Sequence, residues 1–128
     1  MTRTPFAVYR KIYLILQWYG TDYQFSREEI GEYKEPTGDV TVVQSIRGIY
    51  HSTWESFVEL INVEGASVKA KINRGILCDG GAKPLVQQGD QVIVAGVPYQ
   101  VTAVEPVLYN ERTVAWEISL EEKVAGVN

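Results

Sequence analysis

The chain has 128 residues, of which 45% are hydrophobic and 22% are charged, and its formal net charge is -4 at pH 7. This length fits a single domain, residues 1–128, and the negative charge disfavours bulk binding of nucleic acid. The single cysteine, Cys78, cannot form an intramolecular disulfide, so we expect a reducing compartment. The apolar runs are far shorter than the roughly 20 residues of a membrane-spanning helix. We therefore expect neither secretion nor a membrane partner.

The first 20 residues predict a helix with clear signals at both ends. Thr4 suits the N-cap, Pro5 the first helical position and Gly20 the position just past the end. Apolar side chains cover most of the helix, which indicates either burial across its own domain or docking on a neighbouring subunit. The residues expected to form a subunit interface are Phe6, Tyr9, Tyr13, Leu16 and Trp18.

Two strands are predicted next, at residues 21–26 and 40–50, the second being rich in Val, Ile and Thr. Residues 27–39 between them are highly charged and contain Gly and Pro, which predicts a long, mobile hairpin loop. Such loops are often functional, but a tolerated surface excursion is an equal alternative because long loops cost little extra closure entropy. The interaction residues expected on this loop are Ile30, Tyr33, Glu35 and Pro36.

The middle of the chain fits two local structures. Residues 52–55 match a capping box, and the apolar residues after them have helical spacing. The same segment also alternates as a strand, and Gly65 offers a turn into a second strand at residues 67–73. The hairpin is slightly favoured over the helix for residues 52–63. A short apolar strand at 76–78 and a loop at 79–84 follow.

The last third of the chain has the most regular pattern. Residues 89–104 predict an antiparallel hairpin around a short turn. Residues 112–120 alternate as a half-buried strand does, with Val114, Trp116, Ile118 and Leu120 on one face and Thr113, Ala115, Glu117 and Ser119 on the other. We expect a mainly β fold, an antiparallel β-barrel or compact sandwich of about six or seven strands. It comprises an N-terminal α-helix (1–20), a β body (21–122) with one long hairpin loop, and a tail (123–128).

No group of residues in the chain predicts catalysis. His51 is the only histidine and lacks the three or four partners of a zinc site. The adjacent carboxylates at 28–29 and 121–122 are expected to be solvated, and the last strand is expected to hold no nucleophile, base or metal ligand. The glycines at 80–81 lack the pattern of a phosphate-binding loop. We therefore expect no enzyme and no catalytic, metal-binding or cofactor-binding residue.

Several short motifs follow one another along most of the chain after Gly20. They are Glu35-Pro36-Thr37-Gly38, Ile46-Arg47-Gly48-Ile49-Tyr50-His51, Gly75-Ile76-Leu77-Cys78, Gly89-Asp90-Gln91-Val92, Tyr99-Gln100-Val101 and Ile118-Ser119-Leu120-Glu121. Their order and spacing resemble those of the head-closure or head-tail connector proteins of tailed bacteriophages. This resemblance implies a non-enzymatic β-barrel in the virion, assembled in the bacterial cytoplasm. Its partners would be further copies in a homo-oligomeric ring, the portal or adaptor, and tail proteins.

The resemblance also implies a role for the loop at 27–39, which in such proteins projects into the channel or toward the neighbouring ring. Its acidic balance would let channel DNA pass without specific binding. A tail terminator or other minor tail protein is an alternative of the same class. A single-stranded nucleic-acid-binding β-barrel is an alternative of another class, with aromatic stacking and with Lys69, Lys71 and Arg74 on phosphates.

Overall fold

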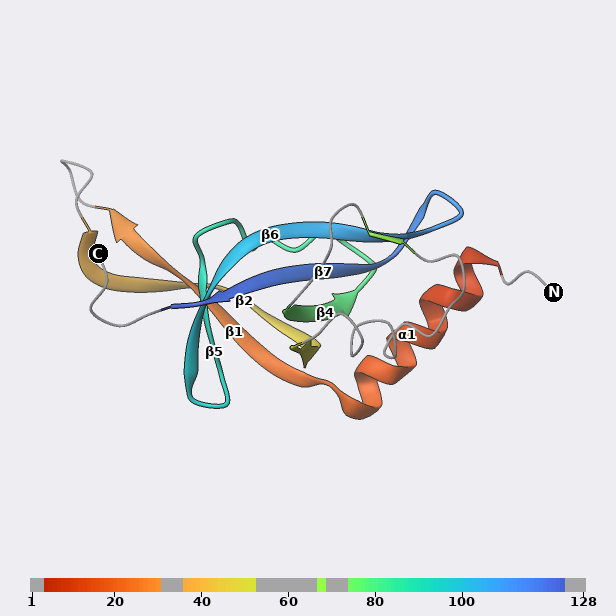
Figure 1. Ribbon diagram of the computed structural model, residues 1–128, viewed down its shortest axis with the longest axis horizontal. Coiled ribbons are helices and arrows are strands. Elements are labelled where there is room, and N and C mark those ends of the chain that lie inside the picture. The colour runs from red at the N-terminus through yellow and green to blue at the C-terminus, as the bar shows by residue number, and fades with distance from the viewer. Residues whose placement is uncertain (1–3, 31–35, 53–66, 69–73, 124–128) are drawn as a thin grey trace.

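One helix and a curved antiparallel sheet make up this protein in the computed structural model, which describes residues 4–30, 36–52, 67–68 and 74–123 (Figure 1). The helix lies at one end of the long axis, beside the sheet. The elements in chain order are α1 (Pro5–Tyr19), β1 (Thr21–Ile30), β2 (Pro36–His51), β3 (Ser67–Val68), β4 (Gly75–Asp79), β5 (Gln91–Val94), β6 (Val97–Tyr109) and β7 (Arg112–Glu122). The predicted mainly β fold with an N-terminal helix is confirmed.

The sheet closes on itself to form a ring. Its strand order is β3-β6-β5-β1-β2-β4-β7, and β6 pairs with β7 as well, so β6, β5, β1, β2, β4 and β7 form the ring and the short β3 pairs with β6 outside it. The β1–β5 step is the weakest, because the described residues of these strands share one pair, Ser26 with Gln91. The ring is therefore not quite a complete barrel.

Local signals set the ends of α1 as the sequence predicted. The Thr4 hydroxyl accepts a hydrogen bond from the Ala7 N–H at 3.1 Å, and the Gly20 N–H donates to the Leu16 carbonyl at 2.8 Å. Val8 and Ile12 are fully buried with Leu16, at the i, i+4 spacing that places them on one side of a helix. This row of three packs against β7, β4 and β2 and fixes the helix to the sheet.

The predicted β1–β2 hairpin is present, but the prediction of a long loop over residues 27–39 is wrong. β1 continues to Ile30 and β2 starts at Pro36, and these two residues pair with each other. Residues 31–35 lie outside the described part of the chain. The charged sequence is compatible with strands here because this end of the hairpin extends beyond the ring (Figure 1), where both faces of a ladder can carry polar side chains.

The C-terminal strands confirm one prediction and correct another. Ala95 and Gly96 form the two-residue turn between β5 and β6, and both have positive φ, as this kind of hairpin turn requires. β7 is present, but it is not half-exposed in its centre, because Ala115 and Glu117 are as fully buried as Val114 and Ile118. Ala115 packs in the helix-side core, whereas Glu117 contacts His51 of β2.

Two apolar clusters hold the fold together. The first lies between α1 and the sheet, and the second fills the ring, where it includes Phe25, Ile76, Val101 and Ile118.

The ambiguous middle segment is described only in part. Ser67–Val68 pairs with β6, and the question of helix or hairpin at residues 52–63 falls almost entirely outside the described residues. The predicted strand around Cys78 is present as β4, and no strand interrupts residues 80–90.

Candidate functional site

The most prominent exposed apolar surface of the described residues lies on α1. Phe6, Leu14 and Trp18 are 69%, 44% and 77% exposed, and with Arg10 they form an i, i+4 series that we call the outer row. Tyr13 and Tyr19 extend the exposed surface. A helix that buries one row and exposes a second aromatic row has a surface typical of an interaction site.

The structure separates the five helix residues that the sequence predicted for a subunit interface. Phe6, Tyr13 and Trp18 are exposed. Leu16 is 1% exposed and belongs to the protein's own core, so the expectation that it faces a neighbour is wrong. Tyr9 is half-buried and stacks on Tyr13 with ring centroids 6.4 Å apart. Leu14 was missing from the predicted set, although its spacing from Trp18 and Arg10 places it in the outer row.

The residues predicted for the interaction loop lie at the far end of the β1–β2 hairpin. Ile30 and Pro36 are the last and first residues of the two strands and form the outermost pair of the ladder. Tyr33 and Glu35 lie outside the described residues. The described exposed apolar residues of this hairpin lie closer to the ring. They include Val40 and Val42, which are 59% and 54% exposed.

A buried pair, His51 and Glu117, corrects one expectation from the sequence. The last strand does contain a titratable group, Glu117, which contacts His51. His51 Nε2 lies 2.9 Å from Glu117 Oε2 and contacts Oε1 more closely, while the two side chains are 1% and 0% exposed. Burial raises the pKa of Glu117 to about 6, and the hydrogen bond and charge of His51 oppose this shift.

The pair links β2 to β7 across the intervening strand β4. Gly75 of β4 pairs with His51 on one side and with Ser119 on the other. A Cβ on Gly75 would lie 2.7 Å from Glu117 Oε1 and 2.6 Å from the Ile118 carbonyl oxygen. The glycine therefore leaves the space in which the two side chains meet. Because both are sealed from solvent in this structure, the geometry supports a structural role rather than catalysis.

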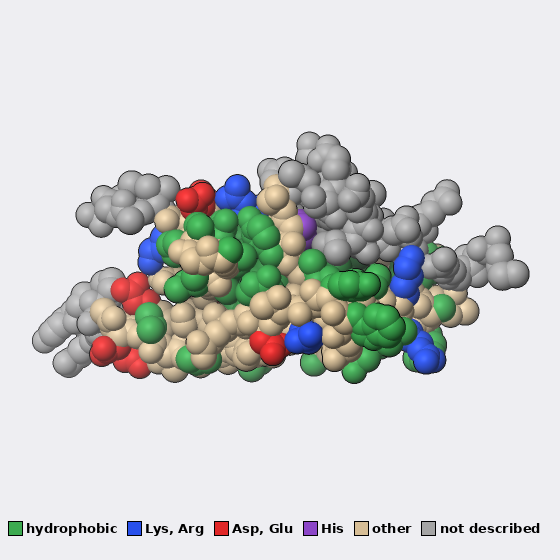
Figure 2. Space-filling view, turned by 90° about the horizontal axis from the view of Figure 1, so that it is seen from below, with side chains coloured by type: hydrophobic (Ala, Val, Ile, Leu, Met, Phe, Trp, Pro, Cys, Tyr) green, Lys and Arg blue, Asp and Glu red, His purple; other side chains and the backbone are tan. Residues whose placement is uncertain are grey.

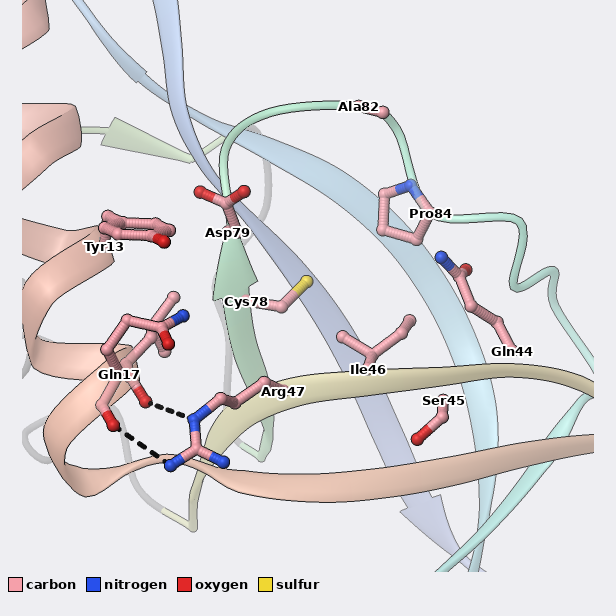
Figure 3. Close-up of a pocket in the computed structure, with 11 residues that line it drawn as sticks. Tyr13, Gln17, Gln44, Ser45, Ile46, Arg47, Cys78, Asp79, Ala82 and Pro84 are labelled. Atoms are coloured by element: carbon pink, nitrogen blue, oxygen red, sulfur yellow. Dashed lines mark hydrogen bonds between the residues drawn. The ribbon is translucent and has the colours of Figure 1, made fainter.

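A cleft of about 330 Å³ lies between the C-terminal half of α1, β2 and the loop after β4 (Figure 3). Arg47 occupies one side, where its Nε and Nη2 donate to the Leu16 and Gln17 carbonyls, both at 3.0 Å. These bonds satisfy carbonyls at the helix end and place a positive charge there, which is favourable for the helix dipole. The main polar contacts of this cleft thus attach α1 to the sheet.

Cys78 also lines this cleft but has the properties of a core residue. Its thiol donates to the Trp116 carbonyl at 3.4 Å. Burial, with smaller contributions from Glu117 and Asp79, raises its pKa to about 12. A thiol held protonated at neutral pH is a poor nucleophile, so the cleft offers no activated cysteine.

Comparison with protein-family models and with curated proteins finds no match for this chain. Across residues 4–30, 36–52, 67–68 and 74–123, no helix has the length and apolar character needed to span a bilayer. The same residues contain no cluster of three or more His, Cys, Asp or Glu side chains that could hold a metal ion. The exposed outer row of α1 and the exposed valines of the β1–β2 hairpin are the candidate sites.

Proposed function

We propose that this protein is an assembly subunit, whose function is to contact other protein chains. The observation that carries this proposal is the outer row of α1, which presents two large aromatic side chains and a leucine to solvent beside a fully buried apolar row. Interfaces are enriched in aromatic residues and arginine, and the outer row contains both. The cost of leaving Phe6 and Trp18 exposed in a monomer is offset when a partner covers them.

Within this class, the proposed role is that of a head-closure or connector protein at the head-tail junction of a tailed bacteriophage. It would form a homo-oligomeric ring between portal or adaptor and tail proteins. The order of motifs supports this role, and so does a rigid ring-like sheet with a contact helix at one end and a hairpin at the other (Figure 1). The acidic character of residues 27–39 would keep channel DNA from adhering.

The test uses the portal and tail proteins encoded in the same genome. The full chain is mixed with each of them, and complexes are separated by size and imaged by electron microscopy. We expect ring-shaped complexes on the portal protein, and we expect Trp18→Ser to reduce them because it removes the most exposed aromatic side chain of the outer row. Binding to the tail tube but not to the portal would indicate a tail terminator instead.

A second measurement separates this role from that of a nucleic-acid-binding barrel. Fluorescence anisotropy with a labelled single-stranded oligonucleotide, repeated over a range of salt concentrations, reports the number of phosphate contacts. The connector role predicts negligible binding. Tight binding with a steep salt dependence, together with no complex with portal or tail proteins, would refute the proposed function.

A further inference from the structure

Two surfaces with complementary properties lie at opposite ends of this molecule. The helix α1 is at one end of the long axis, and the β1–β2 hairpin extends to the other (Figure 1). Gly20 alone separates α1 from β1, which has 10 residues and spans about 30 Å at the usual rise of a strand. α1 is also held against the sheet by Val8, Ile12 and Leu16, which are buried, so its exposed side faces away from the sheet and can meet the hairpin only of another copy.

The charges of these two ends are opposite. Residues 1–20 contain three basic residues and no acidic one, whereas residues 27–39 contain five acidic and two basic residues. Figure 2 shows the described part of this pattern, with Lys and Arg at the end of α1, and with Asp and Glu beside some Lys and Arg side chains toward the end of the hairpin. Opposite charges on two contact surfaces favour their encounter and disfavour contact between two like surfaces.

The hairpin also has an apolar surface beside its acidic groups. Val40 and Val42 are exposed, and Glu28 lies directly opposite Val40 in the ladder, so the carboxylate and the valine share one face. Leu85, 65% exposed, lies with Val42 and Glu28 on the wall of a cavity of about 720 Å³. This surface, which we call the hairpin patch, consists of Glu28, Val40, Val42 and Leu85.

A β-bulge explains why the hairpin patch faces outward. Phe25 pairs with Gln44 and Ser26 with Val42, so Val43 is an extra residue on β2. Such a bulge shifts the alternation of side chains and bends the strand. Phe25 on the ring side is completely buried, whereas Val42 just beyond the bulge is exposed. The bulge therefore marks the boundary between the core of the ring and the hairpin patch.

We propose that the outer row of α1 from one copy docks on the hairpin patch of the next copy, in a head-to-tail contact. Phe6, Leu14 and Trp18 would cover Val40, Val42 and Leu85, and Arg10 would lie against the carboxylate of Glu28. The contact is heterologous, because it joins two different surfaces of the same chain, and its repetition closes into a ring or extends as a filament. The inference rests on the proposed function, for which it names the surfaces between subunits.

A symmetric contact between two α1 helices is less favourable on these grounds. It would bring Arg10 of one outer row close to Arg10 of the other, with no acidic residue in residues 1–20 to compensate. It would also leave the exposed valines of the hairpin patch in water. The head-to-tail contact covers both apolar surfaces and pairs the opposite charges.

The test is a complementation experiment with the full chain alone, followed by sedimentation velocity up to millimolar concentration. One variant carries Phe6→Ser and Trp18→Ser, and the other carries Val40→Ser and Val42→Ser. Each should lose self-association by at least about tenfold, the usual minimum effect of removing interface residues that contribute to affinity. An equimolar mixture should form a one-to-one dimer and nothing larger, because one intact helix then meets one intact hairpin patch.

The mixture also serves as its own folding control, since only folded variants can complement each other. Ile93→Ser is the matched control, because Ile93 is 69% exposed on β5 and belongs to neither surface. This variant should associate as the wild type does. Self-association of the Val40→Ser, Val42→Ser variant at wild-type strength would overturn the inference, and so would a mixture that stays monomeric or a wild type that is monomeric throughout.

Charge reversal provides an independent measurement. Arg10→Glu and Glu28→Lys should each weaken association, and their combination in one chain should recover most of it. Failure of the combination to recover would contradict the pairing of these two groups. These assays contain no portal or tail protein, so a chain that complements as expected but binds neither partner would refute the proposed function while leaving the head-to-tail contact in place.

Discussion

The replacement of Gly75 by alanine tests the structural role of the buried His51–Glu117 pair. The new Cβ would lie 2.6 Å from the Ile118 carbonyl oxygen and 2.7 Å from Glu117 Oε1. Contacts this short are repulsive, and the backbone oxygen cannot rotate away as a side chain can. β4 must therefore move away from β7, and the Glu117 side chain must also shift relative to His51.

The expected loss of stability follows from these two outcomes. Overpacking of a well-packed site costs typically about 1–3 kcal/mol, and leaving a buried hydrogen-bonding group without its partner costs about 1–3 kcal/mol. Replacing glycine in a strand returns about 0.5–1 kcal/mol through lower backbone entropy of the unfolded chain. We therefore expect Gly75→Ala to lower the free energy of unfolding by about 2–3 kcal/mol.

Urea unfolding at pH 7, followed by tryptophan fluorescence, measures this change. With a slope of about 1–3 kcal/mol/M for a small domain, the midpoint should fall by about 1 M or more. Gly81→Ala is the matched control, because Gly81 is exposed and its Cβ would meet nothing closer than the end of the Asp79 carboxylate, at 3.0 Å. A Gly75→Ala chain within about 0.5 kcal/mol of the wild type would refute the reasoning.

Three further predictions concern single side chains. The pKa of Glu117 is about 6 in the folded chain and lower in the unfolded one. In urea titrations, the stability advantage of the wild type over Glu117→Gln should therefore shrink by about 2 kcal/mol as the pH rises from about 4 to 7. A stability difference that stays constant over this range would contradict the prediction. Cys78, with its pKa near 12, should react with Ellman's reagent only after unfolding, and rapid labelling of the native chain would disprove its burial. Arg27 Nε lies 2.8 Å from Asp90 Oδ1, beside the single residue pair that joins β1 and β5. Asp90→Asn removes the charge of this ion pair and should therefore speed amide exchange at Gln91. Unchanged exchange would show that the ion pair does not hold the ring closed.

The features predicted correctly from the sequence depend on neighbouring residues. The helix ends follow from Thr4 and Gly20, and the β5–β6 turn follows from a Gly-containing dipeptide between two β-rich runs. The charge density of residues 27–39 predicts a loop, whereas residues 27–30 and 36–39 belong to the strands of the β1–β2 hairpin. A two-stranded arm exposed on both faces needs no apolar alternation, so composition there cannot separate strand from loop.

The contacts that were missed join residues far apart in the chain. His51 and Glu117 are 66 positions apart and meet only because Gly75 of the strand between them has no side chain. A single sequence has no signal that pairs these three residues before the order of strands is known. The outer row of α1 is different, since the i, i+4 series through Leu14 and Trp18 was available in the sequence and was obscured by the apolar residues on every side of the helix.

The attachment of α1 leaves its outward residues free to change. Val8, Ile12 and Leu16 bury one row, and Arg47 binds main-chain carbonyls rather than side chains. None of these anchoring contacts involves Phe6, Leu14 or Trp18. In the proposed head-to-tail contact, substitutions along the outer row would therefore alter which surface the helix binds while the sheet keeps its stability, so partner choice and folding could evolve on separate sets of residues.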